Sequence, residues 1–283
     1  MNKAYIRFPQ FRRKAVTLSY DDGMRQDKRL IEIMQKHGLK GTFNINSGMF
    51  EEEYNGTEKG RMTLEEAKDL YLSSGMEVAV HGYHHIPLPF VDIATATNDV
   101  CKDRGELERI FGRIIIGMAY ANGAYSDEVV EMLKMNGIKY ARTVKATGNF
   151  DLPSDWLRLP ATTHHNDPTL MELARQFVEQ EEKEKPYYWL NKPQMFYLWG
   201  HSYEFDDNDN WQVIEEFAEY IGNREEIWYV TNGEIYDYLQ ACDRLEFSMD
   251  ASIVYNPSCV DVWIDYFGKK CLIPAGQSVS LKD

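Results

Sequence analysis

The chain has 283 residues, of which 43% are hydrophobic and 27% charged, and its formal net charge is −14. This balance is ordinary for a globular protein, while the acidic charge argues against a nucleic-acid partner, whose phosphate backbone attracts basic residues. No segment approaches the ~20 apolar residues of a membrane span, and the N-terminus has no apolar core of signal-peptide length. We therefore expect a cytoplasmic protein with neither a nucleic-acid nor a membrane partner.

Strands and helices are predicted to alternate along most of the chain. Short apolar runs predict strands, over residues 15–20, 41–46, 77–80, 114–120, 138–144, 195–201 and 227–230. Apolar residues at helical spacing predict helices, over residues 27–38, 63–75, 100–112, 126–137, 167–184, 210–222 and 232–242. About seven such units predict an α/β fold whose parallel sheet closes into a distorted (β/α)7-type barrel. The aperiodic segment 145–166 is expected to be an irregular and functional loop.

The sequence changes character after residue 243. Short alternating runs separated by turn residues predict β-hairpins there. We expect a barrel domain over residues 1–243 and a small C-terminal β-hairpin extension over residues 244–283, packed on the barrel. The extension carries no motif, so covering one barrel end, extending a substrate groove and forming a homo-oligomer all stay open.

The cysteines of the chain form no CxxC pair. Their spacing predicts neither a structural zinc site nor a disulfide framework, so we expect reduced thiols. They are Cys101, Cys242, Cys259 and Cys271.

Two adjacent carboxylates, Asp21 and Asp22, stand between the first predicted strand and Gly23. A strand-terminating turn explains one acidic residue beside a glycine, but not two that repel each other. The alternative is a division of labour in which one carboxylate holds a cation and the other moves a proton.

Histidines follow two other predicted strands. His81 and His85 come after residues 77–80 and are four residues apart, so on a helical turn their rings would point the same way. Together with one carboxylate they form a set that suits Zn²⁺ or another divalent ion, whereas a histidine-rich surface loop is the simpler alternative. His201 ends the predicted strand 195–201, directly after the run MFYLWG. Because the carboxyl ends of parallel barrel strands share one face, we expect these residues to meet there.

The adjacent pair His164 and His165 lies in the irregular segment 145–166. A second metal site is one interpretation. Adjacent residues point apart, however, so substrate contact or loop packing is favoured.

Five short motifs, in order, resemble those of the NodB-like polysaccharide deacetylases, carbohydrate esterase family 4, over roughly residues 14–241. They are SYDDG, HGYHH, AYANG, SDW and LWGH. The resemblance implies a barrel with a divalent metal bound by Asp22, His81 and His85. It further implies Asp21 as general base and His201 as general acid.

The same resemblance implies supporting roles. Asp155 would orient His201, the backbone N–H of Asn122 would face the oxyanion, and Tyr120 of the same turn would contact substrate. Three apolar side chains would line the acetyl pocket: Trp156, Leu198 and Trp199.

The third motif departs from the family pattern. Ala119 stands where family members commonly have an arginine that pairs with the catalytic aspartate, and Ala121 replaces a proline. Arg142, at the end of the strand 138–144, is predicted to replace that arginine beside Asp21.

Together with these residues, the resemblance implies a metal-dependent hydrolase that removes N-acetyl or O-acetyl groups from a saccharide. Zinc is the expected metal, with Co, Ni and Mn open because the ligand set discriminates poorly. One alternative is an amidohydrolase that acts on a small or cyclic non-sugar amide. A catalytically inactive carbohydrate-binding protein is a second alternative, with aromatic stacking platforms at Trp156, Trp199, Tyr203 and Trp211.

Overall fold

The computed structural model describes residues 5–54, 56–179 and 191–282. Within these residues, a central sheet of 9 strands has the order β7-β6-β5-β4-β3-β2-β9-β8, with β10 also paired to β2. Every pairing in this sheet is parallel. Its strands are β2 (Lys14–Asp21), β3 (Gly41–Ile45), β4 (Glu77–Val80), β5 (Gly117–Ala119), β6 (Tyr140–Ala146), β7 (Leu159–Ala161), β8 (Thr163–His164), β9 (Gln194–Gly200) and β10 (Ile227–Tyr229).

The two ends of this sheet approach each other through one residue. Strands β7 and β8 are separated only by Thr162, whose N–H donates to the carbonyl of Tyr197 on β9 at 2.8 Å. The path from β7 to β8 therefore bends the sheet back onto β9, which gives the distorted barrel that the strand–helix alternation predicts. The short strands β7 and β8 lie inside segment 145–166, which was expected to be irregular.

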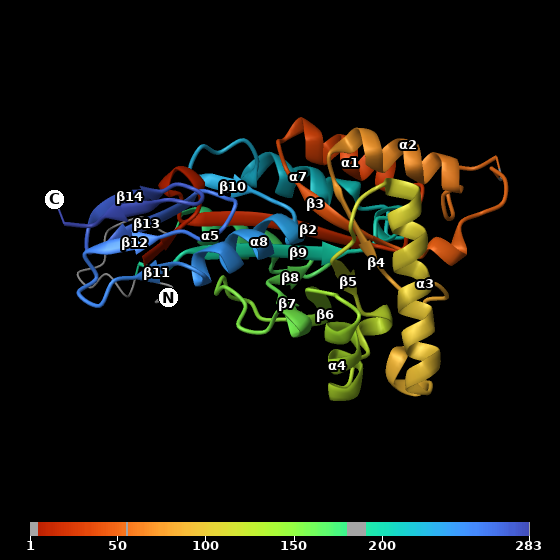
Figure 1. Cartoon of the computed structure of the whole chain (residues 1–283). Helices are drawn as coiled ribbons and strands as arrows, with labels where there is room; N and C mark the ends of the chain where they lie inside the picture. Colours follow the sequence, from red (N-terminus) through yellow and green to blue (C-terminus); the bar gives the residue numbers. More distant parts are fainter. Residues whose placement is uncertain (1–4, 55, 180–190, 283) are drawn as a thin grey trace.

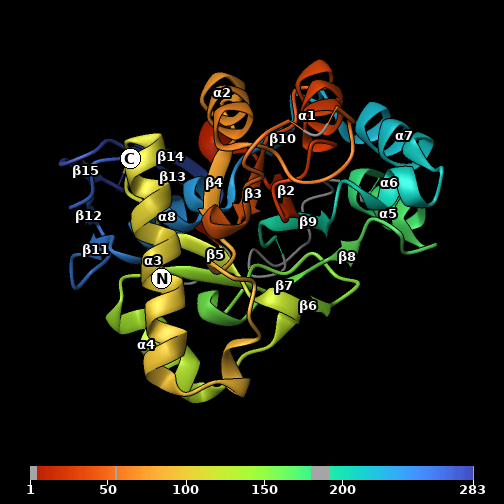
Figure 2. The same cartoon turned by 90° about the vertical axis from the view of Figure 1, so that its right-hand side faces the viewer.

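Helices cover the outside of the sheet (Figures 1 and 2). They are α1 (Asp27–Lys36), α2 (Leu64–Ser74), α3 (Ile93–Phe111), α4 (Asp127–Met135), α5 (Leu170–Glu179), α7 (Trp211–Ile221) and α8 (Asn232–Asp243), with the single turn α6 (Glu204–Asp207). Helix α2 begins with the capping box that Thr63 and Glu66 predict, in which each side chain bonds the other residue's backbone N–H. The predicted helix 167–184 corresponds to α5, and its last five residues lie outside the described part of the chain.

Side chains of β9 alternate between two hydrophobic clusters, because successive strand residues point to opposite faces. Phe196 and Leu198 pack into the cluster shared with α1, α5 and α7. Met195, Tyr197 and Trp199 join the second cluster, which continues to α8 and the C-terminal strands. The position of a residue in the strand therefore decides whether its side chain can approach the site described below.

The C-terminal residues form two small antiparallel sheets at one end of the molecule, on the left in Figure 1. Their strands are β11 (Glu246–Phe247), β12 (Ile253–Tyr255), β13 (Val262–Tyr266), β14 (Lys269–Ile273) and β15 (Ser278–Ser280). The N-terminal strand β1 (Ile6–Arg7) pairs with β13. This confirms the predicted β appendage, whereas the division at residue 243 stays a prediction.

All four cysteines are free, as expected. In the part of the chain that the structure describes, no helix combines the length and apolar character that crossing a bilayer requires. The cytoplasmic location stays a prediction.

Candidate active site

Polar residues from three strand ends converge at the carboxyl face of the barrel. Asp21 ends β2, His81 follows β4, and His201 follows β9. The Asp21 Oδ2 atom lies 3.8 Å from His81 Nε2 and 3.9 Å from His201 Nε2. The convergence predicted from the shared face of the barrel is therefore present.

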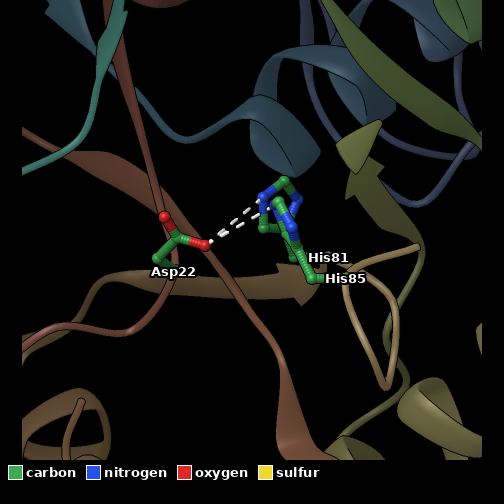
Figure 3. Close-up of side chains that lie close together, drawn as sticks. All are labelled: Asp22, His81 and His85. Atoms are coloured by element: carbon green, nitrogen blue, oxygen red, sulfur yellow. Dashed lines mark ion pairs between the residues drawn. The ribbon is translucent and has the colours of Figure 1, made fainter. Parts of the chain in front are cut away.

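Asp22, His81 and His85 form a compact cluster of donor atoms (Figure 3). The Asp22 Oδ1 atom lies 3.8 Å from His81 Nε2 and 3.7 Å from His85 Nε2. Ligands about 2.1 Å from a common ion are separated by roughly this distance in tetrahedral geometry. Burial and the neighbouring His81 lower the pKa of His85, which keeps its ring neutral at neutral pH, as metal ligation requires.

His81 is held in the orientation and tautomer that a metal ligand needs. Its Nδ1 lies 3.0 Å from the carbonyl oxygen of Ala119, so Nδ1 carries the proton and donates it there. Its backbone N–H donates to the carboxylate of Asp103 at 3.0 Å. Among the described residues the buried Nε2 atom has no hydrogen-bond partner, and it lies 3.8 Å from Asp22 Oδ1. An orphaned ring nitrogen beside a carboxylate and a second imidazole fits a divalent cation.

The backbone is strained at two of these three positions. Asp22 has φ 84° and His85 has φ 55°, which is the left-handed region that residues other than glycine rarely adopt. Arg61 supports Asp22 by donating to its carbonyl and, at 3.1 Å, to its Oδ1 atom. Such strain persists only where surrounding contacts enforce it, and it concentrates at functional sites.

Asp21 is almost fully buried, and two side chains satisfy its carboxylate. The Arg142 guanidinium donates to Oδ2, and Asn44 Nδ2 donates to Oδ1 at 2.9 Å. Burial alone would raise the pKa of Asp21, but the charges of Arg142, His81 and His201 and the hydrogen bond from Arg142 together outweigh it and bring the pKa down to about 2. Arg142 also lies over the Trp199 ring, 4.3 Å from its centroid. The carboxylate is therefore ionised throughout the neutral range.

His201 has a carboxylate partner other than the expected one. Its Nδ1 lies 3.3 Å from Glu204 Oε1, in the same turn of chain. Burial alone would lower the pKa of His201, but the hydrogen bond to Glu204 and the negative charge of Asp21 together raise it above the ordinary value. His201 therefore carries a proton at higher pH than a free histidine.

The prediction that Asp155 orients His201 is wrong. Asp155 caps the short helix η6 (Trp156–Arg158) by accepting from the Leu157 N–H, and its other oxygen pairs with Arg158 at 2.7 Å. Its side chain is 45% exposed, and its partner Arg158 also pairs with Asp127 of α4 at 2.6 Å.

Trp156, from the same motif, packs edge-on against Tyr236 of α8, with ring centroids 5.2 Å apart. It therefore joins the second hydrophobic cluster, and no contact with the site residues is found for it among the described residues.

Leu198 and Tyr120 were expected to contact substrate, and both are instead buried. Leu198 is fully buried in the cluster that faces the helices. Successive strand residues point to opposite faces, so its neighbour Trp199 lies on the other side of β9. The Tyr120 ring is also buried, and its hydroxyl donates to the Leu157 carbonyl at 2.7 Å. Trp199 does reach the site, with its ring 5.8 Å from that of His201. Asn122 lies exposed in the turn after β5, in left-handed conformation at φ 54°.

Several site residues were not identified from the sequence. Glu204 follows His201 by three residues, a spacing that places two side chains on one face of a turn, and this signal was present. The partners of the other site residues come from distant segments with no common motif. They are Asn44, Arg61 and Asp103.

Comparisons with known proteins agree with the motif resemblance. A profile of the polysaccharide deacetylase family matches residues 9–141. No curated protein sequence matches the chain. A solved deacetylase, PplD of Streptococcus pyogenes in complex with acetate, is 21% identical over 50% of this chain, with a TM-score of 0.44. The match covers 62% of that protein, which is less than two thirds of its length.

Two other solved structures cover most of the chain. One is assigned as a polysaccharide deacetylase from Mycobacterium smegmatis, with 14% identity over 84% of this chain and 94% of its own, and a TM-score of 0.57. The other is Puue allantoinase, with 12% identity over 81% of this chain and 91% of its own, and a TM-score of 0.57. At such identities they show a shared fold, the distorted α/β barrel.

Proposed function

We propose, from its relationship to the NodB-like polysaccharide deacetylases, that this protein is a metal-dependent hydrolase that removes acetyl groups from a saccharide. The observation that carries the proposal is the convergence of Asp21 and His201 on the cluster of Asp22, His81 and His85. This is a base, an acid and a metal-ligand set within reach of one another at the carboxyl end of a barrel.

The proposed metal ligands are Asp22, His81 and His85, and the proposed metal is zinc. Three protein ligands leave coordination positions open, which is typical of catalytic rather than structural sites. When bound, such an ion lowers the pKa of a water ligand toward about 7 and polarises a carbonyl group. Cobalt, nickel and manganese suit the same ligands and are compared in the experiment below.

Asp21 is proposed to accept the proton of the attacking water. Its carboxylate is ionised and held by Arg142 and Asn44, so its free lone pairs have a fixed direction. As the oxygen of that water forms a bond to the acetyl carbon, its proton passes to Asp21 Oδ2.

His201 is proposed to protonate the leaving group. As the bond from the acetyl carbon to the sugar nitrogen or oxygen breaks, the proton on His201 Nε2 moves to the departing atom. Net consumption is one water, and the products are acetic acid, which ionises to acetate, and the free amine or alcohol. The site returns to its starting state when Asp21 gives up its proton and His201 takes one up. The raised pKa of His201 keeps that proton available at neutral pH.

The oxyanion and the acetyl methyl group also need partners. We assign the oxyanion to the backbone N–H of Asn122, in the turn that starts two residues after Ala119, whose carbonyl accepts from His81. Trp199 is assigned to the wall of the acetyl pocket because its ring lies beside both Arg142 and His201. Preorganised N–H donors of this kind typically contribute ~10²- to 10³-fold to turnover.

Acetate release by zinc-loaded protein from a panel of N-acetylated and O-acetylated sugars tests the proposal. We expect release that disappears with chelator and falls by ~10²- to 10⁴-fold in Asp21→Asn and in His201→Ala, the range typical of lost general acid–base catalysis. Near wild-type rates in either variant, with metal content unchanged, would contradict the assignment.

The panel includes small linear and cyclic amides, and matched samples loaded with cobalt, nickel or manganese. If the protein binds metal and hydrolyses those amides but no sugar, its substrate is a non-sugar amide and not a saccharide. Bound sugar with no turnover of any substrate would favour the inactive binding protein.

A further inference from the structure

We infer that Glu204 is the positioning residue of His201, and that the segment His164–His165–Asn166 holds the Glu204 carboxylate for this task; the inference rests on the proposed function for the role of His201 as acid. In this arrangement Glu204 takes the role that the family motif implies for Asp155. Four side chains, from two loops, converge on one carboxylate.

The two oxygens of Glu204 are used differently. Three nitrogen atoms lie close to Oε2. They are His165 Nε2 at 2.8 Å, Asn166 Nδ2 at 3.1 Å and His164 Nε2 at 3.3 Å. Oε1 faces His201 Nδ1 at 3.3 Å. Because Oε2 is surrounded by donors, the carboxylate cannot rotate freely, and Oε1 stays directed at His201.

The tautomer of each loop histidine follows from its contacts. His164 Nδ1 accepts from the backbone N–H of Asn166 at 3.1 Å, so the proton of the neutral ring lies on Nε2 and points at Glu204. His165 is fully buried, with Nε2 2.8 Å from a carboxylate oxygen. Two lone pairs would repel at that distance, so His165 Nε2 also carries a proton.

These tautomers argue against a second metal at the same three side chains. His164, His165 and Glu204 have donor atoms close enough together to suggest one. A metal ligand needs a lone pair on the nitrogen that faces the ion, and His164 Nε2 carries a proton instead. The cluster therefore supports one carboxylate through the hydrogen bond from Asn166 and the close approach of two ring nitrogens.

The charges of the cluster favour the same role. Burial lowers the pKa of His164 to about 4 and also lowers that of His165, so both rings are neutral at pH 7. Burial would raise the pKa of Glu204, but the hydrogen bonds from His165 and His201 hold it well below its usual range. An ionised carboxylate supported by neutral donors keeps its full negative charge for His201.

The position of Glu204 in the chain fixes its distance from His201. Glu204 begins α6, and its backbone N–H donates to the His201 carbonyl at 3.2 Å. The other groups facing His201 are Asp21 at 3.9 Å, the more distant charge of Asp22, and the rings of Tyr203, Trp199 and His164. Within the described part of the chain, Glu204 is the one group within hydrogen-bond distance of Nδ1, and Nε2 lies nearest to Asp21.

The test is nitrogen-15 NMR of histidine-labelled, zinc-loaded protein, with the His201 signals assigned by their loss in His201→Ala. We expect Glu204→Gln to lower the His201 titration midpoint by about one pH unit or more and to reduce the Nδ1–H tautomer of its neutral form. In the acetate assay, the pH at which turnover declines on the alkaline side of the pH profile should fall by the same amount. Glu204→Asp keeps the charge and should restore part of both effects.

Asp207→Asn is the matched control, because Asp207 is an exposed carboxylate on the same turn. Its His201 midpoint should equal that of the wild type. Asn166→Ala, at an exposed position, removes one donor from Oε2 and should change the midpoint by a smaller amount. It also serves as the deciding variant if Glu204→Gln does not fold.

An unchanged His201 midpoint and tautomer in Glu204→Gln, or in Asn166→Ala if that variant decides, would overturn the inference. The NMR readout needs no substrate. A wild-type protein that releases no acetate would therefore refute the proposed function while the titration still decides the role of Glu204.

Discussion

Arg142 contacts Asp21 from a position directly beside Ala119. The two side chains that form the pair are 121 residues apart in the sequence, and β5 and β6 pair in a register that sets Arg142 next to Ala119. The arginine that the third motif lacks at position 119 thus has a counterpart one strand away. The guanidinium reaches the same carboxylate from the neighbouring strand.

We predict that Arg142→Ala lowers both stability and turnover. The pair is almost fully buried, and leaving one charge of a buried pair without its partner costs about 3–5 kcal/mol. Urea unfolding and acetate release measure the two effects. In the double variant Arg142→Ala/Ala119→Arg we expect partial recovery of turnover, since the new guanidinium starts from the adjacent position. A folded Arg142→Ala protein with normal turnover would show that Arg142 does not support Asp21.

Metal content should depend on His81 and not on His84. His81→Ala removes a donor nitrogen that is aimed at Asp22, so the bound zinc measured after dialysis should fall from about one equivalent to a small fraction of it. His84→Ala is the matched control, because the His84 ring pairs with Asp99 and is 60% exposed. Equal zinc retention by the two variants would argue against the proposed ligand set.

Asp155→Asn should leave His201 unaffected. The substitution removes the charge that pairs with Arg158 and keeps a side-chain oxygen for the η6 cap, since asparagine and aspartate cap helices about equally well. The His201 midpoint, measured by the same NMR titration, should match the wild type. A shift as large as that of Glu204→Gln would restore the role that the family motif implies for Asp155.

Stability should decrease as the pH rises toward 7, in part because of Asp27. Burial raises the pKa of this carboxyl from 3.8 to about 7, although Tyr71 donates to it at 2.6 Å. Its folded-state pKa lies above the unfolded one, so its contribution is complete below about pH 4 and is lost as the pH rises through 7. At one pKa unit per ~1.4 kcal/mol, the loss is about 4 kcal/mol at most.

Asp27→Asn cannot ionise and should flatten this pH dependence. Denaturant unfolding at pH 4.5 and pH 7.5 measures the difference for both proteins. If the wild type and the variant lose the same free energy of unfolding between these pH values, Asp27 does not carry the effect.

Much of the barrel and part of its site could be predicted from local patterns. Alternating strand and helix periods determine the parallel sheet. The rule that the carboxyl ends of parallel strands lie on one face predicts that Asp21, His81 and His201 meet there. The i,i+4 spacing of His81 and His85 likewise predicted a shared direction, and their Nε2 atoms both face Asp22.

The partners of these residues were decided by tertiary structure. The i,i+3 spacing of His201 and Glu204 is a local signal, but it cannot exclude Asp155, because the choice between the two carboxylates depends on where η6 and α6 pack. The same holds for Leu198 and Trp199, adjacent in one strand, of which only Trp199 reaches the site. Local sequence sets the period and direction of each element, since these arise from short-range sterics and burial. Contacts between elements arise from the packing of the whole barrel, and that packing places Arg142 against Asp21 and the His164–His165 loop against Glu204.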